Sequence, residues 1–149
     1  MDDSVSLGEA RGWLRERVDR GEHCPLCGQH SKVYKRKLNS GMARSLILMH
    51  KRGGSGWIHI PTELPARSRE EGKLRYWGLI EESPAEREDG GRAGWWRVTS
   101  TGTRFVLGRS TVPKYARIYD DRLLRLDGEP IDIWDALGDK FDYDELMAQ

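Results

Sequence analysis

The sequence predicts a mixed α+β fold, organised as one domain with short appendages. Apolar side chains recur at helical spacing over residues 6–20 and 39–51, and this periodicity is typical of amphipathic helices. Short runs bounded by Gly or Pro occupy 57–60, 79–83 and 95–99, and the first and third are rich in Trp and β-branched residues, as is typical of strands. A chain of 149 residues with six Trp and five Tyr has the size of one domain and enough large rings for one core.

The first predicted element is an amphipathic helix from about residue 6 to residue 20. Leu7, Leu14 and Val18 share its apolar spacing. The side chain of Ser6 is placed to cap the helix, because a Glu follows three residues later in the pattern of a capping box. We therefore expect the chain to begin with a helix.

A second, largely buried helix is expected over 39–51, where apolar side chains occupy one wide face. The glycine-rich segment 53–56 stops it. The run 57–60 predicts a brief strand at the edge of a sheet, because Pro61 ends it and proline cannot donate to a ladder. Residues 62–65 have room for one helical turn.

The next segment combines a helix with a hairpin. A capping box at Ser68 starts a helix that runs to Trp77, and Gly78 closes it. Strands at 79–83 and 95–99 flank a charged, glycine-rich loop and predict a hairpin with a long tip. A further helix at about 101–107 follows.

The C-terminal segment predicts a smaller hairpin and a helix. Strands at 115–119 and 122–126 flank two aspartates. A turn after residue 126 leads to a short helix at 131–137. The last nine residues, 141–149, fit either a docked helix or a frayed acidic tail.

Charge is segregated along the chain although the net charge is only +1. From Asp120 to the C-terminus, 10 acidic residues face 3 basic ones, and the preceding part has an excess of positive charge. A basic body suggests a polyanion partner. The acidic end would repel that partner or would cover the basic surface that binds it. The alternative is that both parts are merely solvated surfaces.

Two short motifs lie in the middle of the chain. Residues 73–81 read KLRYWGLIE, and residues 94–99 read GWWRVT and are followed by Gly102. Many winged-helix regulators have a recognition helix that ends in leucine, glycine and a strand of the form GLI. Their second wing strand often ends in a threonine, after which a glycine opens the next helix. The segment 39–99 therefore resembles the winged-helix form of helix-turn-helix DNA-binding proteins, with an unusually short second helix at 61–66.

The resemblance implies an α+β fold with a winged helix-turn-helix at 39–109. An N-terminal helix and a CPxCG turn would precede it at 1–38. A small acidic extension with a β-hairpin and a helix, residues 110–149, would pack on it or flank it.

The resemblance also implies a DNA-binding surface, in which the recognition helix and the wing carry the cations. Arginine can read guanine in the major groove and can pair with phosphate. The implied residues are Arg67, Arg69, Lys73 and Arg75 on the helix, and Arg87 and Arg92 in the wing.

A separate basic run, Lys35, Arg36 and Lys37, follows the CPxCG turn. It could grip the phosphate backbone without reading base sequence. The alternative is a linker that only increases solubility.

The CPxCG turn itself, with Cys24 and Cys27, is half of a zinc site, because two thiolates at this spacing can reach one tetrahedral ion. His30 and His23 are the nearest candidates for the remaining ligands. Ligation by His50 or His59, or by the two cysteines of a second chain, stays open. A metal-free turn and a redox-active pair are the other interpretations.

The chain has no phosphate-binding glycine loop, no HExxH motif and no nucleophile elbow, so we expect no enzyme. No apolar stretch approaches the roughly 20 residues that span a bilayer, and the first residues lack the features of a secretory signal. We therefore expect a cytoplasmic protein without membrane contact.

The sequence thus predicts a small DNA-binding protein, either a regulator or an accessory factor of a nucleic-acid process, with homodimerisation left open. The alternative is an interaction module that binds or inhibits another protein. Its contacts would be exposed tryptophans and the acidic C-terminal segment.

Overall fold

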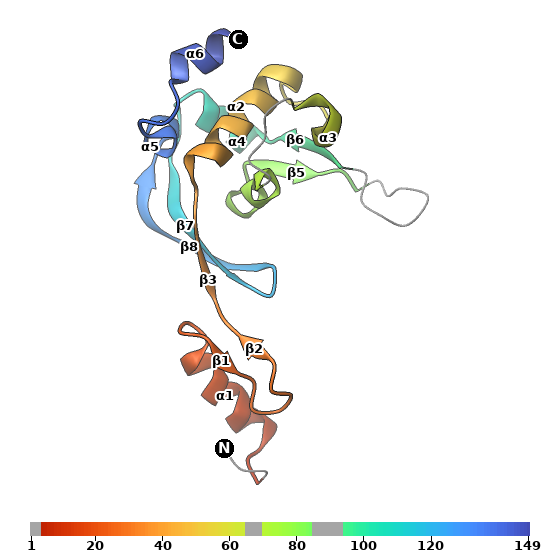
Figure 1. The fold of residues 1–149 in the computed structure, drawn as a ribbon, viewed down its shortest axis with the longest axis vertical. Helices are drawn as coiled ribbons and strands as arrows, with labels where there is room; N and C mark the ends of the chain where they lie inside the picture. The colour runs from red at the N-terminus through yellow and green to blue at the C-terminus, as the bar shows by residue number, and fades with distance from the viewer. Residues whose placement is uncertain (1–3, 65–69, 85–93) are drawn as a thin grey trace.

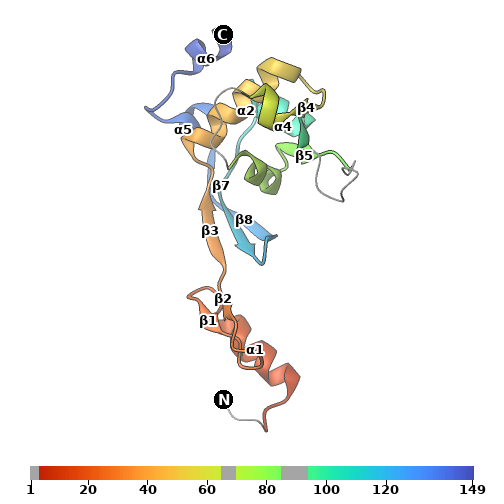
Figure 2. The same cartoon turned by 45° about the vertical axis from the view of Figure 1, so that its right-hand side comes forward.

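The computed structural model describes residues 4–64, 70–84 and 94–149, which form an elongated molecule in three parts (Figure 1). A helix and a short ribbon lie at one end, a three-stranded sheet lies in the middle, and a helical body lies at the other end. Figure 2 shows the same order after rotation about the long axis. The predicted mixed α+β class with small antiparallel sheets is confirmed.

The N-terminal part contains α1 (Leu7–Arg17) and a ribbon of β1 (Glu22–His23) and β2 (His30–Ser31). The predicted cap is present, because Ser6 Oγ accepts the backbone N–H of Glu9 at 3.1 Å. The helix is shorter than expected and, of its residues, only Ala10 is buried. A short antiparallel ladder of β1 and β2 forms on both sides of the CPxCG turn.

The central sheet has the strand order β3 (Tyr34–Lys37), β7 (Val112–Tyr119) and β8 (Arg122–Ile131). The basic run after the CPxCG turn is therefore a strand at the edge of this sheet. Asp120 and Asp121 form the tight turn of the β7–β8 hairpin with φ angles of 49° and 61°, which short polar residues tolerate.

The hairpin is longer than the sequence predicts, because the expected turn after residue 126 does not form. Gly128 stays inside β8 with a φ of 95°. A Cβ atom at this position would lie 2.6 Å from Cδ2 of Tyr115, so the glycine leaves room for the ring of the neighbouring strand. The strand consequently continues to Ile131 before the next helix begins.

The body combines helices with a second antiparallel sheet of strand order β4-β6-β5. As predicted, β4 lies at an edge. In chain order the elements are α2 (Ser40–Gly53), β4 (Ile58–His59), α3 (Ile60–Glu63), η1 (Glu71–Trp77), β5 (Ile80–Glu82), β6 (Trp95–Val98) and α4 (Ser100–Val106).

The predicted helix at 68–77 is a 3₁₀ helix over its described part, η1, rather than an α-helix. It ends as expected, with Gly78 in the left-handed region at a φ of 72°. Trp77 Nε1 donates to the carbonyl of Pro113 at 2.7 Å. This bond attaches η1 to β7 of the central sheet.

The C-terminal helices α5 (Ile133–Leu137) and α6 (Tyr143–Ala148) pack against α2, as Figures 1 and 2 show. Ile133, Leu137 and Leu146 are buried in the same core cluster as α2. Tyr143 Oη donates to the carbonyl of Val106 at 2.7 Å. Of the two interpretations left open for the last residues, the docked helix is therefore confirmed.

Candidate functional site

Two of the implied recognition-helix cations, Lys73 and Arg75, lie on η1, and each has a carboxylate partner. Lys73 Nζ lies 3.3 Å from Oε1 of Glu70. Arg75 Nη2 lies 3.2 Å from both carboxylate oxygens of Asp121, and Arg75 Nη1 donates to the carbonyl of Gly72 at 2.9 Å. Arg75 is thus held by several groups of its own chain, whereas within the described ranges Lys73 contacts the carboxylate of Glu70.

The contact between Arg75 and Asp121 belongs to a junction that joins η1 to the turn of the β7–β8 hairpin. Tyr76 Oη donates to Asp121 Oδ1 at 2.6 Å and accepts a hydrogen bond from Arg75 Nη2 at 2.9 Å. Burial, with a smaller contribution from this bond to Asp121, raises the pKa of Tyr76. Sequence reasoning missed the junction, because no local pattern connects Tyr76 to a residue 45 positions later.

A second group of polar side chains lies between the start of α2 and the start of η1. Asn39 Nδ2 donates to Oε2 of Glu70 at 2.9 Å, while Asn39 Oδ1 caps α2 by accepting the N–H of Met42 at 2.9 Å. The bond from Asn39 lowers the pKa of Glu70, and the charges of Lys73 and Arg36 lower it further. Arg36 and Lys73 therefore lie on the same side of the molecule, beside an ionised carboxylate.

The basic strand β3 divides its cations between two faces of the central sheet. Arg36 is paired with Ala116, which is fully buried. Lys35 is paired with Arg117, and Lys37 with Tyr115. Side chains of directly paired residues share a face and successive ones alternate. Arg36 consequently lies on the side of the core, and its two neighbours lie on the opposite, outer face.

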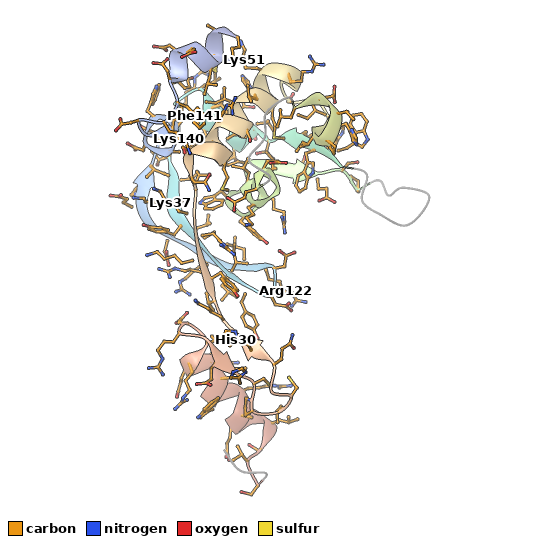
Figure 3. The ribbon with its side chains drawn as sticks, viewed as in Figure 1. His30, Lys37, Lys51, Arg122, Lys140 and Phe141 are labelled. Atoms are coloured by element: carbon orange, nitrogen blue, oxygen red, sulfur yellow. The ribbon has the colours of Figure 1, made fainter. Side chains whose placement is uncertain are left out.

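The outer face gathers further cations that sequence reasoning did not single out. Arg117 and Arg125 both contact Asp127 Oδ2, at 2.9 Å and 3.3 Å. Lys35 Nζ lies 4.1 Å from the ring centroid of Tyr115. The alternation of charged and apolar residues along β7 is the sequence signal that could have found this face. Figure 3 shows Lys37 on the sheet and Arg122 near the hairpin turn.

Four of the implied DNA-binding residues cannot be placed in this geometry. Arg67, Arg69, Arg87 and Arg92 lie outside the described residues.

The strands of the body carry an exposed aromatic face. His59 and Trp95 are paired on β4 and β6, and their ring centroids are 5.2 Å apart. The guanidinium of Arg97 lies 4.4 Å from the ring centroid of Trp57, and Arg97 also pairs with Glu81. Trp57 and Trp95 are 39% and 41% exposed.

The CPxCG turn is a tight knuckle whose backbone faces the first thiol. The backbone N–H of Cys27, followed by that of Leu26, hydrogen-bonds to the Cys24 sulfur and lowers the pKa of Cys24. Gly28 N–H donates to the Cys24 carbonyl at 2.8 Å, and Gly28 has a φ of 77°. Both cysteines are free thiols, and Cys27 is exposed. This turn favours a thiolate at Cys24.

The two predicted histidine ligands form a pair of their own on the ribbon. His23 and His30 are cross-strand partners with ring centroids 5.3 Å apart, and His23 Nδ1 lies 3.0 Å from the Gly28 carbonyl oxygen. Figure 3 shows His30 at this end of the molecule. Among the described residues, no three His, Cys, Asp or Glu side chains gather closely enough to hold a metal. The structure therefore does not unite the four predicted ligands.

No helix within the described ranges combines the length and the apolar character that a bilayer crossing requires. Comparisons of the chain with models of protein families, with curated proteins and with solved structures found no match.

Proposed function

We propose that this chain is a small DNA-binding protein of the winged-helix type, acting as a regulator or an accessory factor of a nucleic-acid process. The observation that carries the proposal is the order of elements in the body. From α2 to α4 the chain follows the order that the resemblance implies, and its three short strands form one sheet. The two wing strands β5 and β6 pair within this sheet.

The proposed DNA surface is the side of the molecule that carries η1. Lys73 and Arg36 lie there, beside the carboxylate of Glu70. Their role would be to contact phosphates, because a lysine offers a point charge and an arginine a fork that matches phosphate geometry. Arg75 would act as a positioning residue, since its donors already bind Asp121 and Gly72.

Glu70 gives this surface a counter-charge that a phosphate would have to overcome. Its carboxylate lies 3.3 Å from Lys73 Nζ. Removing the negative charge by Glu70→Gln should therefore tighten DNA binding, whereas removing a cation should weaken it. The amide oxygen of glutamine can still accept the bond from Asn39.

The test is a titration of the full chain with duplex DNA at two salt concentrations. Binding should weaken steeply with salt, and Arg36→Ala or Lys73→Ala should make the logarithmic salt slope shallower by roughly 0.9 for each phosphate that the variant no longer neutralises. Lys35→Ala is the matched control, because Lys35 is the neighbour of Arg36 on the opposite face of β3. Its slope should stay that of the wild type.

Other outcomes have a definite meaning. If Lys35→Ala and Lys37→Ala change the slope and Arg36→Ala does not, the DNA contacts the outer face of the central sheet. If the wild-type chain binds no duplex at the lower salt concentration, the proposed function fails.

The exposed aromatic face favours a second candidate function, an interaction module for another protein. Trp57, Trp95 and Arg97 lie together on the outer side of β4 and β6. Tryptophan and arginine are enriched among residues that dominate binding energy at protein interfaces. If this face serves a protein partner, Trp57→Ala and Trp95→Ala should leave the DNA titration unchanged.

A further inference from the structure

The CPxCG turn offers two sulfur ligands in a geometry suited to a metal ion. The backbone N–H groups of Cys27 and Leu26 point to the Cys24 sulfur, and Gly28 allows the chain to fold back beneath it. Structural zinc sites are almost always tetrahedral and closed by four protein ligands. The knuckle thus supplies half of such a site.

The histidines of the ribbon do not complete the site within one chain. The rings of His23 and His30 pack against each other with centroids 5.3 Å apart, and His23 Nδ1 lies 3.0 Å from the Gly28 carbonyl oxygen. Among the described residues, no three His, Cys, Asp or Glu side chains lie close enough together to hold a metal. Neither histidine therefore joins Cys24 and Cys27 in one cluster.

The other histidines are too remote to take part. All 4 His and both Cys of the chain lie in described residues. His50 lies in α2 and His59 in β4, both in the body, whereas the ribbon lies at the other end of the elongated molecule (Figures 1 and 2).

We propose that Cys24 and Cys27 of two copies of the chain bind one zinc ion and that this shared site holds a homodimer. A two-fold axis through the metal gives each copy the same role. Two-fold symmetry is the commonest symmetry of soluble protein oligomers. All four thiols are bound as thiolates and release their protons when zinc enters.

Two further observations fit a second copy as the occupant. Leu26, between the two cysteines, is 60% exposed, and a second knuckle bound to the same ion would shield part of this apolar side chain from water. The knuckle also lies far from the body along the molecule, so a second knuckle can reach it without meeting the body (Figure 1).

The experiment uses the full chain, purified under reducing conditions and loaded with zinc. Light scattering should give the mass of a dimer, and elemental emission should give one zinc ion for every two chains. A chelator should return the protein to monomers, and adding zinc again should restore the dimer. Cobalt in place of zinc should show the absorption of a tetrahedral all-thiolate site.

Variants separate the shared site from its competitors. Cys24→Ser and Cys27→Ser should lose both the metal and the dimer, while the circular dichroism of the body stays unchanged. The double variant His23→Ala and His30→Ala should keep both. One zinc ion per chain in a monomer, a protein without zinc, or a dimer that survives the chelator would overturn the proposal.

Discussion

Close packing leaves no room for a side chain at Gly102. A Cβ atom there would lie 2.0 Å from the carbonyl oxygen of Leu79 and 2.7 Å from Cγ1 of Val98. At the same position, the N–H of Gly102 donates to Oγ1 of Thr99, the cap of α4, at 3.0 Å. Thr99 and Gly102 therefore have a physical reason at these positions, which is the close approach of α4 to Leu79 and Val98.

Replacing Gly102 with alanine should accordingly destabilise the body. We expect Gly102→Ala to lower the free energy of unfolding by about 1–3 kcal/mol, because a backbone carbonyl cannot move aside cheaply. Urea denaturation measures this. Gly12→Ala is the matched control: apart from its chain neighbours and the backbone of its own helix, no atom of the described residues lies within 4 Å of a Cβ there, so it should be neutral or slightly stabilising. Equal losses in the two variants would contradict the packing explanation.

Tyr76 joins η1 to the hairpin turn through its hydroxyl group. Tyr76→Phe keeps the ring but removes the bonds to Asp121 and Arg75, and should lower the free energy of unfolding by about 1 kcal/mol. Chemical denaturation at neutral pH measures the loss. Tyr34→Phe serves as the control, because Tyr34 is exposed and its ring contacts to neighbouring cations survive the change.

Glu70 makes the stability of the chain depend on acid pH. Its pKa is lower in the folded state than its ordinary value of 4.5, first because of the bond from Asn39. The contribution of Glu70 to the free energy of unfolding is therefore fully present above pH 4.5, and it is lost as the pH falls through the lower, folded-state pKa. Melting temperatures at neutral and acid pH should differ less in Glu70→Gln than in the wild type. Parallel curves would show that the ionisation of Glu70 does not contribute to the pH dependence of stability.

At the scale of elements, α6 is held to α2 by an apolar contact in addition to the hydrogen bond from Lys51 Nζ to the Met147 carbonyl. Leu146 is buried in the core cluster with residues of α2, although Asp144 and Glu145 directly precede it in the chain. Leu146→Ala should lower the free energy of unfolding by about 2–5 kcal/mol, since it leaves a cavity in the core. Leu7→Ala is the control on an exposed leucine, which is 57% accessible, and thermal melts should show almost no change for it.

The same scale explains which predictions about elements held. Ends set by local chemistry agree with the sequence, such as the Ser6 cap and the left-handed Gly78. Ends that depend on contacts with a neighbouring strand differ from the sequence prediction. Asp127 and Gly128 have the composition of a turn, yet Tyr115 of the paired strand covers Gly128 and the strand continues.

At the scale of the whole molecule, the acidic end is part of the fold. Residues 127–149 include Ile131, Ile133, Leu137 and Leu146, all of them buried in the core. Deleting 127–149 should therefore abolish a cooperative melt, because it removes half of the second strand of the long hairpin and one side of the core. Circular dichroism melts and DNA titrations on this truncation measure both properties. Unchanged melting with tighter DNA binding at low salt would show instead that the acidic end is an autoinhibitor.

The sequence by itself determined the class of the fold, the position of most helices and strands, and the knuckle of Cys24 and Cys27. These depend on side-chain periodicity and on contacts between residues a few positions apart. Tertiary structure alone decided that Arg36 and Lys35 serve different faces, that Asp121 holds Arg75, and that His23 and His30 pair across the ribbon. Strand pairing joins segments that lie far apart in the chain. A shift of one residue in the register of a strand would move each of its side chains to the opposite face of the sheet.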